Sequence, residues 1–574
     1  MRYESNIRGQ NFYAIDPNLR SLLRRESPDL LARHEERLQA FGQWVGSEVD
    51  ACAEYTDRIQ PPRLVEGVEN GDPAASLAIN PRQQEVHREV YRRGIVGLNY
   101  GPEAAPYLLS FAMGYLLSQA DISVHCPATL TGAVAHVLDR FAPQEIKGAY
   151  LAPLLRMDGT ALTGGTWATE REGGSDIGAT TTIARTTADG VRLTGLKWFC
   201  SNAGSDLALA TARPVGAPPG GEGLGLYLVP RRRADGSPNA YRIRRLKEKL
   251  GTRGLATGEI ELVGASAQEV IPPPHGLKLM LEALEFSRVH NAFAAAAIQR
   301  RAFLEAIHYA THRIAFGHPI IAYPMVRDLL LDLQMELEAS LALALAAARA
   351  FDAVRGPESA KAGDAAHAWL RILVALAKYR TAEEAVRSAS RAIEVLGGIG
   401  YTEEYVTARL LRDAQVLPIW EGTANIQALE LLRLTAGGQQ GEKPFASRIG
   451  DEIADLPGAL GQLAAPVQEA LTDASEAVAF IRRNPGEGPR HARALLDLMA
   501  DVACSALLLG AAAAEWSEGD ARRAVLARRY VERRLQTPAR RGLARGSHIP
   551  KGLFEAVVGY EPVEPADLTG KAPE

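Results

Sequence analysis

The feature that most constrains the fold is a change of sequence texture between about Leu162 and Pro274. Within this stretch, short runs rich in Val, Thr, Leu and Ile alternate with turns that contain glycine or proline. Strands at this spacing are typical of a small antiparallel barrel or sandwich. The runs are Val191–Phe199, Leu207–Ala212, Leu224–Val229, Tyr241–Leu246 and Gly258–Val263.

Helical patterns flank this segment on both sides. Near-helical spacing of apolar residues, as in Leu30–Val49, runs through the first 160 residues. After Gly276 long alanine-rich periodic stretches follow, and such helices usually form a closely packed bundle. The polar segment Gly437–Pro444 is typical of a linker, and further helical patterns follow it. We therefore expect an α+β chain with an N-terminal helical domain (1–160), a middle β domain (161–275), a helical bundle (276–436) and an additional helical domain (445–574).

Several classes of protein are excluded by composition and by missing motifs. The chain has 64 basic and 68 acidic residues, and a net charge of −4 is too small for the whole protein to attract nucleic acid or a membrane. Its four cysteines form no CxxC pair, which excludes a zinc ribbon, a thioredoxin motif and a disulfide-framed scaffold. No Walker, Rossmann, GxSxG or HExxH motif occurs, and we expect no metal site.

The expected location is the cytoplasm. The first residues lack the apolar core of a signal peptide. The apolar stretch Ser340–Ala348 is far shorter than the roughly 20 residues that a membrane helix needs. We therefore expect no membrane span.

Three segments are not explained by composition. They are Thr166–Asp176 (TWATEREGGSD), Leu196–Gly204 (LKWFCSNAG), and Glu394–Tyr401 (EVLGGIGY) together with Trp420–Gln427 (WEGTANIQ). Taken singly, the first is typical of a glycine turn and the second of a strand that enters a turn. In the third, Glu421 alone would be interpreted as a carboxylate stabilised by a helix N-terminus.

In this order and spacing, the segments resemble the acyl-CoA dehydrogenase family over roughly residues 80 to 437. Residues 169–176 match its TExxxGSD element, residues 397–401 its GGxGY element, and residues 420–423 its aromatic-Glu-Gly-Thr loop. Residues 313–317 match its RxxFG element, and residues 197–203 match its K-x-W-I-T-N-G strand more loosely. The details, including the extra helical region after Gly437, are most similar to the AidB-like, alkylation-response branch.

The resemblance implies an FAD-dependent oxidoreductase, because no amino-acid side chain accepts a hydride. Its substrate would be an acyl-CoA-like thioester contacted by Ser175 and Arg288, and its electron acceptor stays open. Arg313 and Phe316 would reach the FAD of a neighbouring subunit, which implies a homotetramer. Gly397 and Gly398 would let the backbone approach that same neighbouring cofactor closely. The other cofactor contacts implied are Trp167, Ala168, Thr169, Gly174, Ser175, Phe199, Ser201, Glu394, Trp420, Thr423, Asn425 and Gln427.

Glu421 is the catalytic base that the resemblance implies. It would take the proton from the carbon α to the thioester while the β-hydride passes to flavin N5. A carboxylate in this role needs a raised pKa, and Ile419 and Trp420 indicate an apolar setting. Some family members place the base immediately before the arginine that matches Arg288, but here that residue is Ser287. Glu285 lies on another helix face.

A basic run in the last domain supports a competing function. Between Arg522 and Lys551 there are nine arginines and one lysine against a single acid, Glu532. One interpretation is a flavoprotein of the AidB-like type that binds duplex DNA through phosphates. Others are a solvated arginine face paired with acids elsewhere in the tetramer, and an acidic lipid or protein partner. The predicted DNA contacts are Arg522, Arg529, Arg533, Arg534, Arg540 and Arg541.

Overall fold

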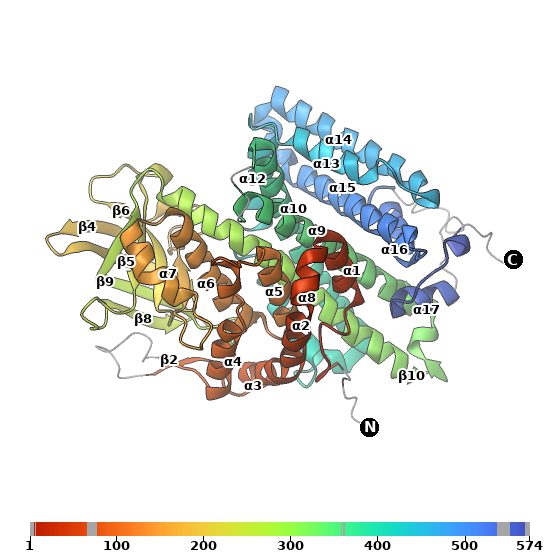
Figure 1. Cartoon of the computed structure of the whole chain (residues 1–574), viewed down its shortest axis with the longest axis horizontal. Helices are drawn as coiled ribbons and strands as arrows, with labels where there is room; N and C mark the ends of the chain where they lie inside the picture. The colour runs from red at the N-terminus through yellow and green to blue at the C-terminus, as the bar shows by residue number, and fades with distance from the viewer. Residues whose placement is uncertain are drawn as a thin grey trace. The chain divides into compact units, whose positions relative to one another are not determined.

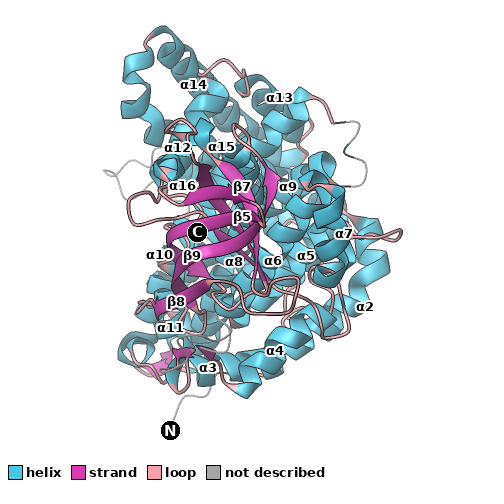
Figure 2. Ribbon diagram, turned by 90° about the vertical axis from the view of Figure 1, so that its left-hand side faces the viewer, coloured by secondary structure: helices cyan, strands magenta, loops and turns pink. Residues whose placement is uncertain are grey.

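In the computed structural model, seven strands between Gly164 and Ile271 form a single sheet. Its strands follow the order β3–β6–β4–β5–β9–β7, β8 pairs with β9, and pairing of β6 with β7 closes the ring. Figure 2 shows these strands in magenta. The barrel predicted from the sequence is confirmed, but β3 and β4 run parallel to β6 rather than antiparallel. The strands are β3 (Gly164–Trp167), β4 (Ile183–Thr187), β5 (Gly190–Ser201), β6 (Leu207–Pro214), β7 (Gly225–Pro230), β8 (Tyr241–Leu246) and β9 (Thr257–Ile271).

The structure describes residues 5, 7–65, 77–356, 359, 362–536 and 551–568. The chain divides into two compact units. The β-containing unit comprises Trp44–Ala105 and Ala112–His290, and the helical unit comprises Met1–Gln43, Pro106–Phe111 and Asn291–Glu574. The predicted N-terminal helical domain therefore contributes helices to both units.

In the β-containing unit, helix α6 (Ile122–Phe141) packs against the first strand of the barrel. The backbone N–H of Gly164 donates to Thr131 Oγ1 at 2.9 Å, and a Cβ at Gly164 would meet Val134 at 2.8 Å. Only a glycine therefore allows β3 to approach this helix so closely. The unit also contains α3 (Asp50–Arg58), α4 (Pro81–Arg92), α7 (Gln144–Leu154), the π-helical turn Val45–Val49, much of α5 (Tyr107–Ala120) and the first part of α8 (Gly276–His312).

The helical unit consists of long helices, as the periodicity after Gly276 predicts. Their alanine-rich faces are buried, and α9 and α10 pack along each other. Its helices up to residue 435 are α1 (Pro17–Glu26), most of α2 (Pro28–Trp44), the second part of α8, α9 (Pro324–Arg355), α10 (Asp364–Leu396), α11 (Val406–Ala414) and α12 (Ala424–Thr435).

The additional C-terminal region is built around α15, which contacts α12, α13, α14 and α16 (Figure 1). Among the described residues, Pro485–Ser517 is the one helical stretch long and apolar enough to cross a membrane by composition, and 72% of its most apolar window is buried within the protein. The predicted linker is shorter than expected, because a helix already begins at Glu442. The helices are α13 (Glu442–Ile453), α14 (Ala464–Arg483), α15 (Gly488–Ser517), α16 (Arg522–Arg534) and α17 (Lys551–Gly559).

Candidate active site

A buried ion pair joins the first two motif segments in the β-containing unit. Lys197 Nζ lies 2.7 Å from Glu170 Oε1, and both side chains are fully buried. The second carboxylate oxygen, Oε2, accepts from the backbone N–H and the hydroxyl of Thr181 at 2.6 Å each. Trp198 N–H donates to Thr169 O at 2.9 Å, so the loop after β3 is held against β5. Glu170 was part of the matched motif, but sequence reasoning assigned it no role.

The aromatic pair of the second segment lies in a β-bulge. Between Lys197 and Cys200, β5 has one residue more than its partner strand β9, and bulges turn side chains away from their regular direction. The ammonium of Lys247 lies 3.3 Å from the centroid of Trp198 and 4.7 Å from that of Phe199. Phe199 is nevertheless 55% exposed. An exposed aromatic ring at a bulge is available to stack against a flat ligand.

The predicted flavin contacts in the first segment differ in accessibility. Trp167 is a correction: its ring packs in the barrel core against Tyr241, with centroids 5.3 Å apart, because the residue ends a strand whose alternate side chains point inward. Only its backbone is available to a cofactor. Ala168 and Thr169 are half-buried and Ser201 is half-buried at the end of β5, whereas Gly174 and Ser175 are exposed.

In the helical unit, Glu421 stands in a strained loop between α11 and α12. Its φ of 58° and the φ of 99° at Gly422 are left-handed, a conformation that a residue with a Cβ rarely adopts. Such strain persists where the surroundings over-determine it, and it is concentrated at functional sites. The indole N–H of Trp420 donates to Asn291 Oδ1 at 2.5 Å. The loop is therefore anchored directly before the candidate base.

The residues after Glu421 lead into α12. Thr423 is the N-cap of this helix, and no side chain caps its first turn. The N–H groups of a helix N-terminus suit phosphate oxygens, and the neighbouring Asn425 is exposed. Gln427 is buried, and its Nε2 donates to the carbonyls of Glu421 and Gly422 at 3.4 and 3.2 Å. This side chain holds its own loop in place, and its contact with the cofactor stays a prediction.

Five further predicted contacts lie at exposed positions of the helical unit. Phe316 is 93% exposed and follows Arg313, which is also exposed. Glu394 and the pair Gly397 and Gly398 are exposed where α10 ends. A Cβ built at either glycine meets no atom within 4 Å, so a ligand could approach the backbone there. These open positions, with the uncapped α12, fit a large cofactor that carries phosphates.

The sequence and the fold both match known proteins. Residues 274–434 match the acyl-CoA dehydrogenase C-terminal domain, residues 165–264 its middle domain, and residues 4–157 the adaptive response protein AidB N-terminal domain. Acyl-CoA dehydrogenase family member 11 of Caenorhabditis elegans is 32% identical over 453 residues, which cover 76% of this chain and 73% of that protein. The chain belongs to the acyl-CoA dehydrogenase family.

Other family members extend this comparison. The putative acyl-CoA dehydrogenase AidB of Escherichia coli is 31% identical over 442 residues, 75% of this chain and 78% of that protein. The solved structure of ACDH-11 of C. elegans in complex with C11-CoA has a TM-score of 0.85 and 28% identity, covering 94% of both chains. An acyl-CoA dehydrogenase of Bacillus anthracis, complexed with FAD, shares the fold with a TM-score of 0.69 at 18% identity over 83% of this chain and 82% of that chain. FAD is the cofactor of this family of dehydrogenases.

In the first part of α8, this family member offers no base at the alternative position. Ser287 is buried and donates from Oγ to the carbonyl of Ala283, one turn earlier, at 3.1 Å. Arg288 follows it and is half-buried. A hydroxyl engaged with its own helix cannot take an α-proton, so the expectation of a single base position is unchanged.

Among the described residues, the α16 arginines predicted to bind DNA form ion pairs within the fold instead. Arg522 and Arg523 of α16 are buried and share the buried carboxylate of Glu338, with N–O distances of 2.7 and 2.8 Å. Arg523 also bonds to Glu515 at 2.7 Å. Paired and buried guanidinium groups cannot neutralise a phosphate backbone. The predicted display of Arg522 to DNA is therefore wrong.

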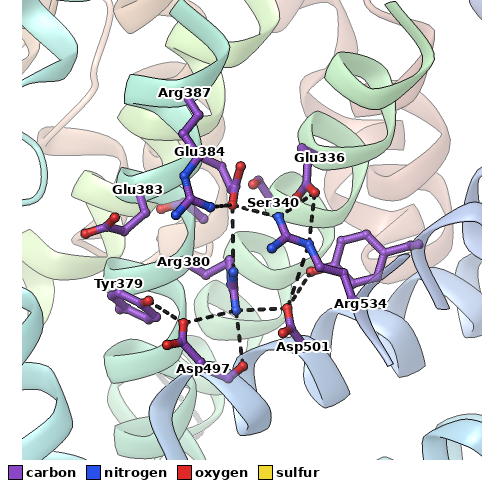
Figure 3. A network of polar contacts seen from close by, with 12 residues as sticks. Glu336, Ser340, Tyr379, Arg380, Glu383, Glu384, Arg387, Asp497, Asp501 and Arg534 are labelled. Carbon is purple, nitrogen blue, oxygen red and sulfur yellow. Dashed lines mark hydrogen bonds and ion pairs between the residues drawn. The ribbon is translucent and has the colours of Figure 1, made fainter. Parts of the chain in front are cut away.

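The second half of α16 gives the same result. Arg529 is buried and bonds to Asp332 at 2.8 Å, and the half-exposed Arg533 lies 3.2 Å from the same carboxylate. Arg534 bridges Glu336 and Glu384 at 2.5 and 2.7 Å (Figure 3). The arginine face thus binds α9 and α10 of its own chain. Arg540 and Arg541 lie outside the described residues.

Proposed function

We propose that this acyl-CoA dehydrogenase oxidises the Cα–Cβ bond of an acyl-CoA-like thioester, with Glu421 as the base that takes the α-proton. The observation that carries the proposal is the left-handed backbone at Glu421. Such a conformation is retained where geometry at one side chain matters more than local stability. The interpretation of Glu421 as a simple helix-end carboxylate does not account for this strain.

FAD, when bound, supplies the acceptor for the hydride that leaves the β-carbon. The chain's own residues then have three tasks. In the β-containing unit, the exposed ring of Phe199 and the loop held by Glu170 present the surface for the flavin. In the helical unit, the α12 N-terminus offers free N–H groups to phosphate oxygens, and the open backbone at Gly397 and Gly398 lets the FAD of a neighbouring subunit approach closely. Glu421 holds and moves the substrate proton at its carboxylate.

A CoA thioester is supported by the structure of ACDH-11, a relative described as bound to C11-CoA. The thioester carbonyl makes the α-proton acidic enough for a carboxylate to remove. The acyl chain accepted by this protein is a separate matter, because it depends on how deep a channel the helices leave. We propose a panel of straight-chain acyl-CoAs rather than one substrate.

The test is anaerobic reduction of the purified flavoprotein by this panel, followed through its visible flavin absorbance. In the wild type at least one acyl-CoA should bleach the band. Glu421→Gln should retain FAD and its melting temperature, yet lose about 10²–10⁴-fold in reduction rate, the contribution of a general base. Glu403→Gln, which removes an exposed carboxylate that pairs with Arg412, is the matched control and should reduce at the wild-type rate.

Retained reduction in Glu421→Gln would refute the assignment of the base and direct attention to Glu285. A wild-type protein that binds FAD but is reduced by no acyl-CoA would refute the proposed reaction itself.

A further inference from the structure

A buried lysine reaches the loop that carries Glu421. Lys378 lies in the middle of α10 and is only 1% exposed. Its ammonium donates to the backbone carbonyl of Gly422, the residue directly after Glu421, at 2.5 Å. Gln427 donates to the same carbonyl at 3.2 Å from the first turn of α12. Two donors from two helices thus converge on one peptide oxygen.

The position of that oxygen restrains the loop directly after Glu421. The peptide between Gly422 and Thr423 can rotate only if the Gly422 carbonyl leaves its donors. Both Glu421 and Gly422 have positive φ, so the loop would relax to a less strained conformation without such restraint. A hydrogen bond from a charged donor is about twice as strong as one between neutral groups. Lys378 is therefore the stronger of the two restraints.

The helix turn that bears Lys378 is itself held in place. The next residue, Tyr379, bonds through its hydroxyl to Asp497 of α15. Arg380 pairs with Asp501 of the same helix at 2.8 Å (Figure 3). The additional C-terminal region is thereby attached to α10 directly beside the lysine. Lys378 consequently projects from a rigid turn of the helix.

We propose that Lys378 is a positioning residue, which fixes the Glu421 carboxylate by clamping the Gly422 carbonyl. This inference rests on the proposed role of Glu421 as the base. It deepens that role by naming the group that sets the geometry of the proton transfer. Lys378 acts only through the loop backbone, and its loss should affect the rate of the chemical step rather than acyl-CoA binding.

The experiment compares Lys378→Met with the wild type in two measurements on the full-length flavoprotein. The first is amide hydrogen exchange of peptides covering residues 416–427. Losing a charged hydrogen bond of roughly 1.5–3 kcal/mol corresponds to about 10–100-fold faster exchange in this segment. The second is steady-state turnover with an accepted acyl-CoA, in which kcat should fall about 10–100-fold while KM stays within about threefold. Lys378→Arg, which retains a charged donor, should recover most of the exchange protection of residues 416–427 and most of kcat.

Thr381→Val is the matched control. Thr381 lies one turn further along α10, is fully buried, and donates from Oγ1 to the carbonyl of Ala377 at 2.7 Å. Its replacement removes a buried hydrogen bond from the same helix without touching the Glu421 loop. Exchange in residues 416–427 and kcat should stay at wild-type values in this variant.

The outcomes separate this inference from the proposed reaction. If Lys378→Met leaves exchange in residues 416–427 unchanged, the clamp is refuted, whatever the activity. If no acyl-CoA reduces the wild-type flavin, the reaction is refuted, but the exchange data still decide whether Lys378 restrains the loop. If Lys378→Met does not fold, Lys378→Gln takes its place: its shorter, uncharged side chain removes the charged donor to the Gly422 carbonyl, so exchange in the same segment should again accelerate. Unchanged exchange there would refute the clamp as well.

Discussion

At the scale of single residues, the buried pair Glu170–Lys197 holds the loop after β3 against β5 of the barrel. Burial alone would raise the pKa of Glu170, but the Lys197 ammonium and the hydroxyls of Thr181 and Thr182 hold it at about 2. This value lies below the ordinary 4.5, so the unfolded chain binds more protons between these two pH values. The carboxylate therefore stabilises the fold above about pH 4.5, and this contribution is lost as the pH falls towards 2.

Replacing Lys197 by Met should destabilise the β-containing unit by about 3–5 kcal/mol at neutral pH, because the Glu170 carboxylate would stay buried without its counter-ion. Lys147→Met is the matched control, since Lys147 forms a partly exposed pair with Asp139 at 2.7 Å and should contribute at most about 1 kcal/mol. The stability of each variant is measured by urea unfolding, with hydrogen exchange in residues 164–201 as the probe. Equal stabilities of the two variants would contradict a structural role of the buried pair.

At the scale of elements, α16 binds the C-terminal region to the helical bundle. Its arginines face acids from α9, namely Asp332, Glu336 and Glu338, which lie almost 200 residues earlier in the chain. One carboxyl group of this interface, that of Glu336, has a strongly raised pKa although it lies beside an arginine. Burial and the nearby Glu384 both raise the pKa of Glu336 and Arg534 lowers it, so that the net value is about 7.

The raised pKa of Glu336 predicts a pH-dependent helical unit. The folded state holds a proton on this carboxyl between about pH 4.5 and 7 that the unfolded chain releases. The contribution of Glu336 to the free energy of unfolding is therefore fully present below about pH 4.5 and is lost as the pH rises through 7. Glu336→Gln should flatten the decline of the melting temperature between about pH 5 and 8, a free-energy change on the order of 3 kcal/mol.

Glu383→Gln is the control for that experiment, because Glu383 is a carboxylate of α10 at the edge of the same network, 3.5 Å from Arg493. It should leave the pH profile as it is in the wild type. Differential scanning calorimetry at a series of pH values measures the effect. A Glu336→Gln profile that declines as steeply as the wild type would show that the group does not bind a proton on folding.

At the scale of the whole molecule, exposed apolar side chains point to assembly. Phe316, Met325 and Tyr401 of the helical unit are 93%, 84% and 80% exposed. Phe316 has a left-handed φ of 50°, and its ring packs edge-on to Tyr323 with centroids 6.3 Å apart. A large aromatic side chain held outward by a strained backbone is typical of a contact surface. We propose that a neighbouring subunit covers it.

Light scattering should give the wild type a native mass of four 61.8 kDa chains. Phe316→Asp places a charge in the proposed contact, and we expect smaller species together with a lower FAD content per chain. Val215→Asp, which changes a 60% exposed residue after β6, should keep both the mass and the cofactor. A Phe316→Asp protein with the wild-type mass and FAD content would contradict this assembly.

Local patterns in the sequence determined the element order, the barrel and the position of Glu421, because periodicity, turn residues and short motifs act over a few neighbouring residues. The arginine face of α16 was equally visible in the sequence. Whether this face is exposed to water or paired with carboxylates depends on α9, which lies next to α16 only in the folded chain. The same holds for Trp167, whose ring turned inward to the barrel core, and for Gln427. Lys378 carried no local signal at all, since its contact with Gly422 joins residues 44 positions apart. Charge pairing and burial are long-range properties, and the tertiary structure alone decided them.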